Sequence, residues 1–253
     1  MNTTGITYVG HATVLIKTNE KRILTDPILR NRIGFLKRYR HAVRKDSYQS
    51  VDAVLISHMH RDHFDIPSLR FLGNSTMLIA PKEAVKYLKM KGFSNLKEVD
   101  VDDCISIGDV IISITPACHH GRLNSFRPTS HTTIGFVIQG NHRIYFPGDT
   151  DLFDDMINLG KDLDVALLPI WGWGPTLGPG HLNPKRAAEA LKLLRPSIAI
   201  PIHWGTFCPI GMGWLRLKYL SEPPKQFAYY ARQMAPEVKV HRIEPGGQIR
   251  LVK

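Results

Sequence analysis

Four potential metal ligands, His58, His60, Asp62 and His63, lie within six consecutive residues in the segment SHMHRDH. Residues two apart point to the same side of an extended chain, so His58 and His60 can bind one ion. The chain must turn after them, which lets Asp62 and His63 face a second ion. Imidazole and carboxylate ligands at this density match zinc, and they also accept manganese or iron. The H-x-H-x-D-H spacing argues against the alternative, a set of unrelated surface histidines.

Further ligands are needed, because one cluster cannot complete the coordination of two ions. Three apolar, strand-like runs end in a suitable residue: ISITPACHH supplies His119, RIYFPGDT supplies Asp149, and IAIPIHW supplies His203. Open α/β sheets place their ligands at the carboxyl ends of strands. Asp149 can bridge two ions because a carboxylate has two oxygens. The pattern predicts a two-metal centre assembled from four strand ends.

Strand-like runs alternate with helical stretches along almost the whole chain. Helices are predicted at residues 81–91, at 184–194, where apolar residues recur with helical spacing, and from about 225 to 234. The strands TIGFVIQ and RIYFPG are joined across Gly140-Asn141, a hairpin-type turn. This alternation predicts a layered α/β architecture. No linker or change of composition divides the chain, so we expect a single domain over residues 1–253.

The composition is that of an ordinary globular protein, with 253 residues, 43% hydrophobic and 22% charged. No apolar run reaches the roughly 18 residues that a membrane-spanning helix needs. The first residues do not have the pattern of a signal peptide. Three cysteines at wide spacings do not indicate a disulfide framework, so we expect a cytoplasmic protein.

The net charge of +11 is concentrated in part between Pro27 and Lys45, where no acidic residue occurs. The seven basic residues of this segment are Arg30, Arg32, Lys37, Arg38, Arg40, Arg44 and Lys45. One interpretation is a patch for phosphate-bearing partners, such as a lipid headgroup, a nucleotide or RNA. The alternative, a solvated loop that keeps the protein soluble, is favoured because charge runs usually lie on solvated surface.

The sequence resembles the metallo-β-lactamase superfamily over essentially its whole length. The motifs ILTDP, SHMHRDH, PACH, FPGDT and PIHWGT occur in that family's order. The resemblance implies an αββα sandwich, two mixed sheets flanked by helices, with the metals at one edge. It implies that His58, His60 and His119 hold the first metal, that Asp62, His63 and His203 hold the second, and that Asp149 lies between them. Asp26 matches a family aspartate that braces the loops.

Within the superfamily, the sequence is most similar to the branch of N-acyl-phosphatidylethanolamine phospholipase D and the ascorbate-phosphate lactonases. The shared segments include GHATVLI, DAVLISH, LLPIWG, HLNPKRAAEA and IPIHWGTF. The branch places its ligand at PA-x-H, which selects His119 over His120, so His120 is expected at the rim of the centre. His131, in a polar loop near His119, is a weaker candidate for lining the pocket. His181 matches a histidine of the branch at H-x-x-P and is the candidate for protonating a leaving group. His11 is expected to orient a ligand or a loop.

Two adjacent cations can generate hydroxide from water and polarise the scissile group, so no serine or cysteine nucleophile is needed. Asp62 is expected to orient the hydroxide as well as to bind metal. The function predicted first is hydrolysis of a phosphodiester in an anionic small molecule or lipid, which is compatible with peripheral membrane contact. The second is opening of a lactone. The third, RNA processing or binding, has only the net charge in its favour, since no nucleic-acid module is present and nucleic acid is not an expected partner. The sequence predicts no oligomeric state.

Overall fold

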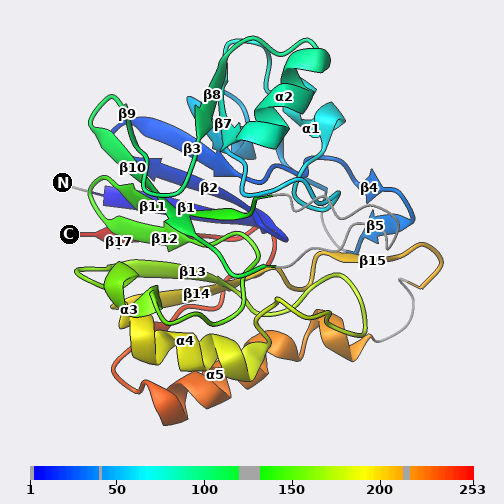
Figure 1. Cartoon of the computed structure of the whole chain (residues 1–253). Helices are drawn as coiled ribbons and strands as arrows, with labels where there is room; N and C mark the ends of the chain where they lie inside the picture. Colours follow the sequence, from blue (N-terminus) through cyan, green and yellow to red (C-terminus); the bar gives the residue numbers. More distant parts are fainter. Residues whose placement is uncertain (1–2, 40–41, 120–131, 213–216) are drawn as a thin grey trace.

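Two seven-stranded sheets pack face to face in the computed structural model, and helices cover their outer faces (Figure 1). The structure describes residues 3–39, 42–119, 132–212 and 217–253. Sheet 1 has the strand order β17-β1-β2-β3-β6-β7-β8, and sheet 2 has the order β16-β14-β13-β12-β11-β10-β9. Buried side chains of both sheets form one core between them. The α/β fold is the αββα sandwich that the sequence predicts.

Sheet 1 combines antiparallel and parallel pairs. Its strands are β1 (Thr3–Gly10), β2 (Thr13–Thr18), β3 (Lys21–Thr25), β6 (Ala53–Leu55), β7 (Met77–Pro81), β8 (Leu96–Val99) and β17 (Gln248–Val252). β17, β1, β2 and β3 pair antiparallel, whereas β3, β6, β7 and β8 pair parallel. In β1, Ile6 and Tyr8 point into the core between the sheets, while Gly5 and Thr7 are partly exposed. This alternation is typical of a strand with one covered face.

Sheet 2 is also mixed. Its strands are β9 (Cys104–Ile107), β10 (Val110–Pro116), β11 (Ile134–Gln139), β12 (Arg143–Phe146), β13 (Val165–Pro169), β14 (Ile198–Ile202) and β16 (Lys239–Val240). β9 to β12 pair antiparallel, and β12, β13, β14 and β16 pair parallel. The predicted hairpin at Gly140-Asn141 is the β11–β12 connection. All five residues of β13 are buried, as expected for a parallel strand covered on both faces.

The helices lie on the two outer faces of the sandwich. They are α1 (Ile66–Phe71), α2 (Lys82–Met90), α3 (Met156–Leu159), α4 (Pro184–Leu194), α5 (Pro223–Met234) and the 3-10 helices η1 (Lys45–Ser47) and η2 (Lys218–Leu220). α1 and α2 pack on sheet 1, and α4 and α5 lie beside sheet 2 (Figure 1). α4 has the predicted bounds, because the Asn183 side chain accepts from the amides of Lys185 and Arg186. Within the described residues, no helix is long and apolar enough to cross a membrane.

A small third sheet, which the sequence does not predict, stands beside the sandwich. It contains β4 (Arg32–Ile33), β5 (Leu36–Arg38) and β15 (Phe207–Pro209), paired antiparallel. β4 and β5 form a hairpin inside the basic segment. Arg38 is only 6% exposed, and its guanidinium donates to the carbonyl oxygens of Val9 and Ile28. For Arg38, both interpretations of the basic segment are therefore wrong, because this side chain stabilises the fold; Arg40 lies outside the described residues.

Candidate metal centre

The predicted ligands follow strands of both sheets and meet at one edge of the sandwich. Residues 58–63 follow β6 of sheet 1. His119, Asp149 and His203 follow β10, β12 and β14 of sheet 2. Carboxyl ends of strands therefore position the ligands, as expected for a layered α/β fold. The centre lies between the two sheets, and each sheet contributes part of it.

The first cluster of potential ligands comprises His58, His60, His119 and Asp149, whose ligand atoms all lie within 4.8 Å of one another. Nε2 of His119 lies 3.1 Å from Nδ1 of His60. Nδ1 of His119 donates to the carbonyl oxygen of Gly180 at 2.7 Å, which leaves Nε2 with a lone pair when the ring is neutral. Nε2 of His58 is buried and has no hydrogen-bond partner in the part of the chain that the structure describes. A cation among these nitrogens would satisfy them.

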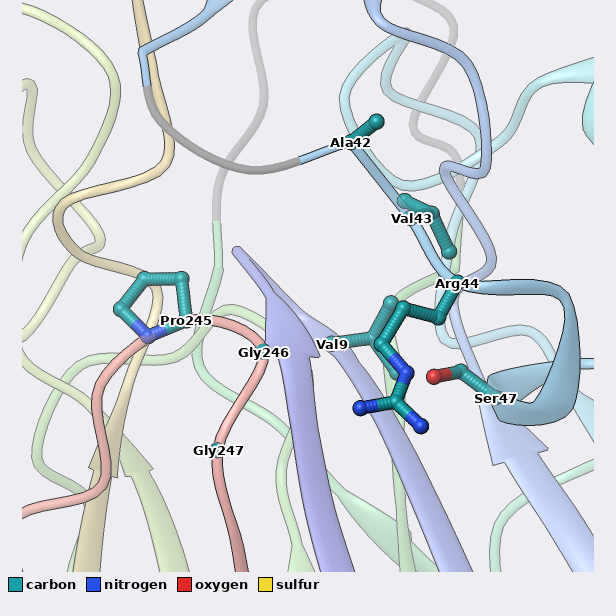
Figure 2. A pocket seen from close by; sticks show the side chains of 8 residues that line it. All are labelled: Val9, Ala42, Val43, Arg44, Ser47, Pro245, Gly246 and Gly247. Atoms are coloured by element: carbon teal, nitrogen blue, oxygen red, sulfur yellow. The ribbon is translucent and has the colours of Figure 1, made fainter.

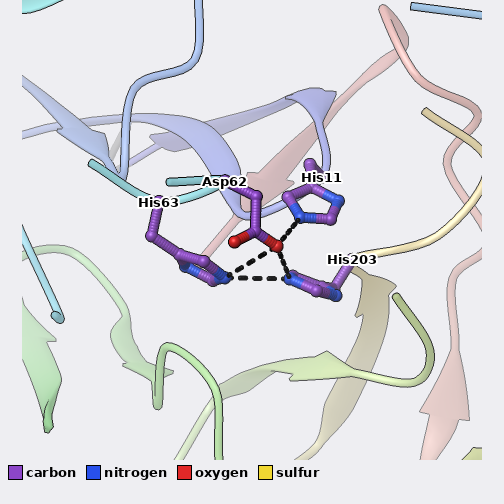
Figure 3. Close-up of side chains that lie close together, drawn as sticks. All are labelled: His11, Asp62, His63 and His203. Carbon is purple, nitrogen blue, oxygen red and sulfur yellow. Dashed lines mark hydrogen bonds and ion pairs between the residues drawn. The ribbon is translucent and has the colours of Figure 1, made fainter. Parts of the chain in front are cut away.

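The second cluster comprises His11, Asp62, His63 and His203, again with ligand atoms within 4.8 Å (Figure 3). Nδ1 of His63 lies 2.7 Å from Oδ2 of Asp26, and Nδ1 of His203 lies 2.7 Å from the carbonyl oxygen of Trp171. Because those oxygens only accept, each Nδ1 carries a proton. In the neutral rings, both Nε2 atoms then have lone pairs, and they face each other at 2.9 Å. Two lone pairs at this distance fit a site for a cation.

Asp149 lies between the two clusters. Its Oδ2 is 3.1 Å from Nε2 of His63, and its Oδ1 is 3.2 Å from Nε2 of His203. Oδ1 is buried and accepts no hydrogen bond from the described residues. A buried polar atom without a partner is rare and calls for an explanation, which an ion would supply. The donors therefore fit two cations that share this carboxylate.

The electrostatics of the centre favour neutral rings at His60 and His203, an ionised carboxylate at Asp149 and a positive charge at His63. Burial lowers the pKa of His60 to about 4 and that of His203 to about 3, so both rings are neutral at neutral pH. Burial would raise the pKa of Asp149, but His203 and His63 hold it well below its usual value. Burial would lower the pKa of His63, yet Asp149 and Asp62 raise it well above the ordinary value. The carboxylates thus favour a positive charge at this position, which a metal ion would also provide.

The Asp26 carboxylate orients side chains of both clusters through hydrogen bonds. Its Oδ1 accepts from the amide of Ser57 at 2.8 Å, and its Oδ2 accepts from the Ser57 hydroxyl at 2.6 Å and from Nδ1 of His63. The Ser57 hydroxyl is also 2.9 Å from Nδ1 of His58. One carboxylate therefore orients a ring in each cluster, in agreement with the bracing role expected for Asp26.

His11 belongs to the second cluster, although the sequence predicts only that it orients a ligand or a loop. Its Nε2 lies 2.9 Å from Oδ2 of Asp62, and its ring centroid lies 3.7 Å from that of His203. It follows β1, so it too stands at a strand end, and that placement was the available signal. Its contacts fit the expectation that it orients a ligand, and they also place it among the potential ligands.

His181 lies at the rim of the centre. Its Nε2 is 3.3 Å from Oδ2 of Asp149, and its side chain is 23% exposed. Its ring packs edge to face against His119, with centroids 4.6 Å apart. It can therefore reach both the shared carboxylate and solvent. His120 and His131, the other rim candidates, lie outside the described residues.

A cavity of about 570 Å³ lies beside the end of β1 (Figure 2). Its lining includes Val9 of β1, Arg44 and the turn at Gly246 and Gly247. It contains none of the predicted metal ligands. The Arg44 guanidinium there pairs with Asp46, so this basic side chain is already neutralised.

An αββα sandwich with histidine and aspartate clusters at one edge is the architecture that defines the metallo-β-lactamase class. Residues 21–204 match the model of the family described as "Beta-lactamase superfamily domain", and the chain belongs to this family. It is 30% identical over 246 residues to a UPF0173 metal-dependent hydrolase of Methanopyrus kandleri, covering 95% of this chain and 97% of that protein. The protein is thus a metal-dependent hydrolase of the metallo-β-lactamase superfamily.

Two further similarities were found, one to a protein sequence and one to a solved structure. The chain is 31% identical over 242 residues to the N-acyl-phosphatidylethanolamine-hydrolyzing phospholipase D 1 of Caenorhabditis elegans, covering 86% of this chain and 67% of that protein. Among solved structures, it resembles a metallo hydrolase of Ignicoccus hospitalis with a TM-score of 0.76 and 23% identity, covering 99% of each chain. The second similarity concerns the fold alone.

Proposed function

We propose that the protein is a two-metal phosphodiesterase. The observation that carries this proposal is the pair of ligand clusters with Asp149 between them, in which buried atoms of His58 and Asp149 accept or donate no hydrogen bond within the described residues. The first metal would be held by His58, His60 and His119, the second by Asp62, His63 and His203, and Asp149 would contact both. Five imidazoles in the set favour zinc, and manganese or iron are the alternatives.

The side chains have distinct tasks in this reaction. When bound, the two cations lower the pKa of a water molecule and neutralise charge that develops on the phosphate. Asp62 accepts a hydrogen bond from the attacking water and so fixes its direction. His11 orients the Asp62 side chain through its contact with Oδ2 of that carboxylate. Asp26 holds the ring of His63 through Nδ1, which keeps Nε2 turned toward the centre.

His181 is the proposed donor of the proton that the departing alkoxide needs. Burial would lower the pKa of His181, but the hydrogen bond to Asp149 raises it above the usual value. The hydrogen bond to Asp149 thus favours the protonated ring, and the partial exposure of the ring gives a leaving group access to it. A donor with such a pKa matches the requirement for general acid catalysis.

Support for a phosphodiester substrate comes from the similarity to the phospholipase D of Caenorhabditis elegans, whose name denotes hydrolysis of such a bond. The test is a parallel assay of metal-analysed protein with bis(p-nitrophenyl) phosphate and with a panel of lactones. The expected result is metal-dependent turnover of the phosphodiester that Asp149→Asn abolishes. Efficient opening of lactones without phosphodiester turnover would replace the proposal with the lactonase alternative.

A further inference from the structure

Exposed apolar side chains concentrate on one patch next to the small third sheet. Four of the ten large hydrophobic side chains that are exposed among the described residues lie there, although they come from three distant segments. They are Phe35, Trp173, Ile210 and Met212, exposed by 58%, 36%, 45% and 38%, and we call them the aromatic platform. Isolated exposed hydrophobics are normal, whereas a contiguous group of them indicates an interaction site.

Direct contacts show that the platform is one surface. The rings of Phe35 and Trp173 meet edge to face, with centroids 5.3 Å apart. The amide of Ile210 donates to the carbonyl oxygen of Phe35 at 2.9 Å, and the amide of Met212 donates to that of Pro209. Pro209 belongs to β15, which pairs with β5 of the hairpin that carries Phe35. The hairpin and the two loops are thus held together by backbone bonds and ring packing.

The charge around the platform has one sign. Residues 31–38, 170–181 and 207–212, which supply the platform and its supports, contain no aspartate or glutamate. Arg32 and Lys37 are exposed and lie opposite each other on the hairpin. The whole chain carries a net charge of +11. Charge complementarity therefore points to an anionic partner with an apolar interior.

The platform is connected to the metal centre. Trp171, two residues before Trp173, accepts the hydrogen bond from Nδ1 of His203, and its indole nitrogen donates to Gly174. On the other side, β15 begins four residues after His203. Short stretches of backbone therefore join the platform to His203 and to the residue that accepts its hydrogen bond.

We propose that the platform docks the protein on an anionic membrane surface, with the two aromatic rings in the interfacial region. Aromatic rings favour this region, since it offers apolar contact and water together. Lysine and arginine beside them are attracted by anionic headgroups. Association through a shallow apolar face of this kind is peripheral and reversible. The docking goes beyond the proposed phosphodiesterase activity and does not depend on it.

The test is flotation of the metal-loaded full chain with vesicles of phosphatidylcholine and phosphatidylglycerol, compared with vesicles of phosphatidylcholine alone. Wild type should partition onto the anionic vesicles. Phe35→Ser and Trp173→Ser should each weaken partitioning about tenfold, because each removes a large buried apolar contact with the lipid. Phe71→Ser is the matched control, since this ring is 56% exposed but lies on α1.

Two further arms make the result decisive. Lys37→Ser should weaken partitioning about fivefold at low salt, and this defect should shrink as salt screens the attraction. Asp149→Asn should float like wild type, which separates docking from the reaction. Wild type that ignores anionic vesicles, or a loss of binding as large for Phe71→Ser as for Phe35→Ser, would overturn the proposal. A concentration-dependent dimer that Phe35→Ser dissolves would also overturn it, by assigning the platform to a second copy of the chain.

Discussion

Most imidazoles of the centre have one nitrogen bound to a protein acceptor and the other turned inward. The acceptors are Gly180 for His119, Trp171 for His203 and Asp26 for His63. Such partners fix the tautomer and the ring orientation, which makes a nitrogen a better metal ligand. The orientation of the histidine rings in the centre therefore depends on residues that do not themselves belong to the ligand set.

Asp26→Asn tests this dependence. The amide cannot accept all three hydrogen bonds and carries no charge, so Nδ1 of His63 loses its charged partner. We expect metal affinity to fall about 10- to 100-fold, as usual for such supporting groups. Titration with a competing chelator measures it, and Asp46→Asn, in the exposed 3-10 helix η1, is the control. Equal affinity in both variants would mean that Asp26 does not brace the ligands.

His181→Ala separates proton donation from metal binding. Loss of a positioned acid should reduce turnover about 10²- to 10⁴-fold. Metal content should stay at the wild-type level, because His181 is outside both ligand clusters and meets the centre through Asp149 and by ring packing against His119. The defect should be smaller for substrates whose leaving group needs no proton, such as a nitrophenolate. A variant that loses metal would make His181 a ligand, and one with full turnover would remove it from the mechanism.

At the scale of elements, the sequence predicts what local patterns encode. α4 has the predicted bounds because its apolar period and its Asn183 cap are local. The ligand-bearing loops could be predicted since each follows an apolar run of a strand. The small sheet could not, because β4 and β5 contain two and three residues, with charged side chains among them. Its third strand pairs Phe207 with Arg38, far away in the sequence.

Arg38 shows the consequence for the basic segment. Its guanidinium joins the hairpin to β1 through Val9 and lies 5.0 Å from the ring centroid of Phe207. Arg38→Ser would leave buried carbonyl groups unpaired, so we expect a loss of about 1–3 kcal/mol in the free energy of unfolding. Arg44→Ser, at a 75% exposed side chain, should change it by no more than about 0.5 kcal/mol. Urea denaturation measures both free energies. Equal stability of the two variants would mean that Arg38 does not stabilise the fold and would support the solvated-loop interpretation.

At the scale of the whole molecule, the metal centre connects the two sheets, because its residues follow strands of both. Residues 58–63 come from sheet 1, and His119, Asp149 and His203 come from sheet 2. Ligands brought together only by folding make metal binding a contribution to stability. The sequence predicted that these histidines and aspartates follow strand ends and meet, but the contact of His11 with Asp62 depends on the packing of both sheets.

Acid should destabilise the metal-loaded protein. In the unfolded chain, histidines take up protons below pH about 6.5. In the folded protein, burial lowers the pKa of His60 to about 4 and that of His203 to about 3, and bound metal also opposes protonation. The unfolded state therefore binds more protons, and stability falls as pH drops from about 6.5 toward 4. The melting temperature measured across this range should decrease, with metal released; a rising melting temperature would contradict the assignment of neutral ligands.

The metal content of purified protein, measured together with its turnover, is the most direct test of the two-metal centre. After metal loading and removal of free ions, wild type should retain about two ions per chain, as a two-metal hydrolase requires. Asp149→Asn should retain at most about one ion and lose nearly all turnover, because this carboxylate is shared by both clusters. Full turnover of wild type with no bound metal would contradict a metal-dependent reaction altogether. Two tightly held ions and normal turnover in Asp149→Asn would contradict the shared centre.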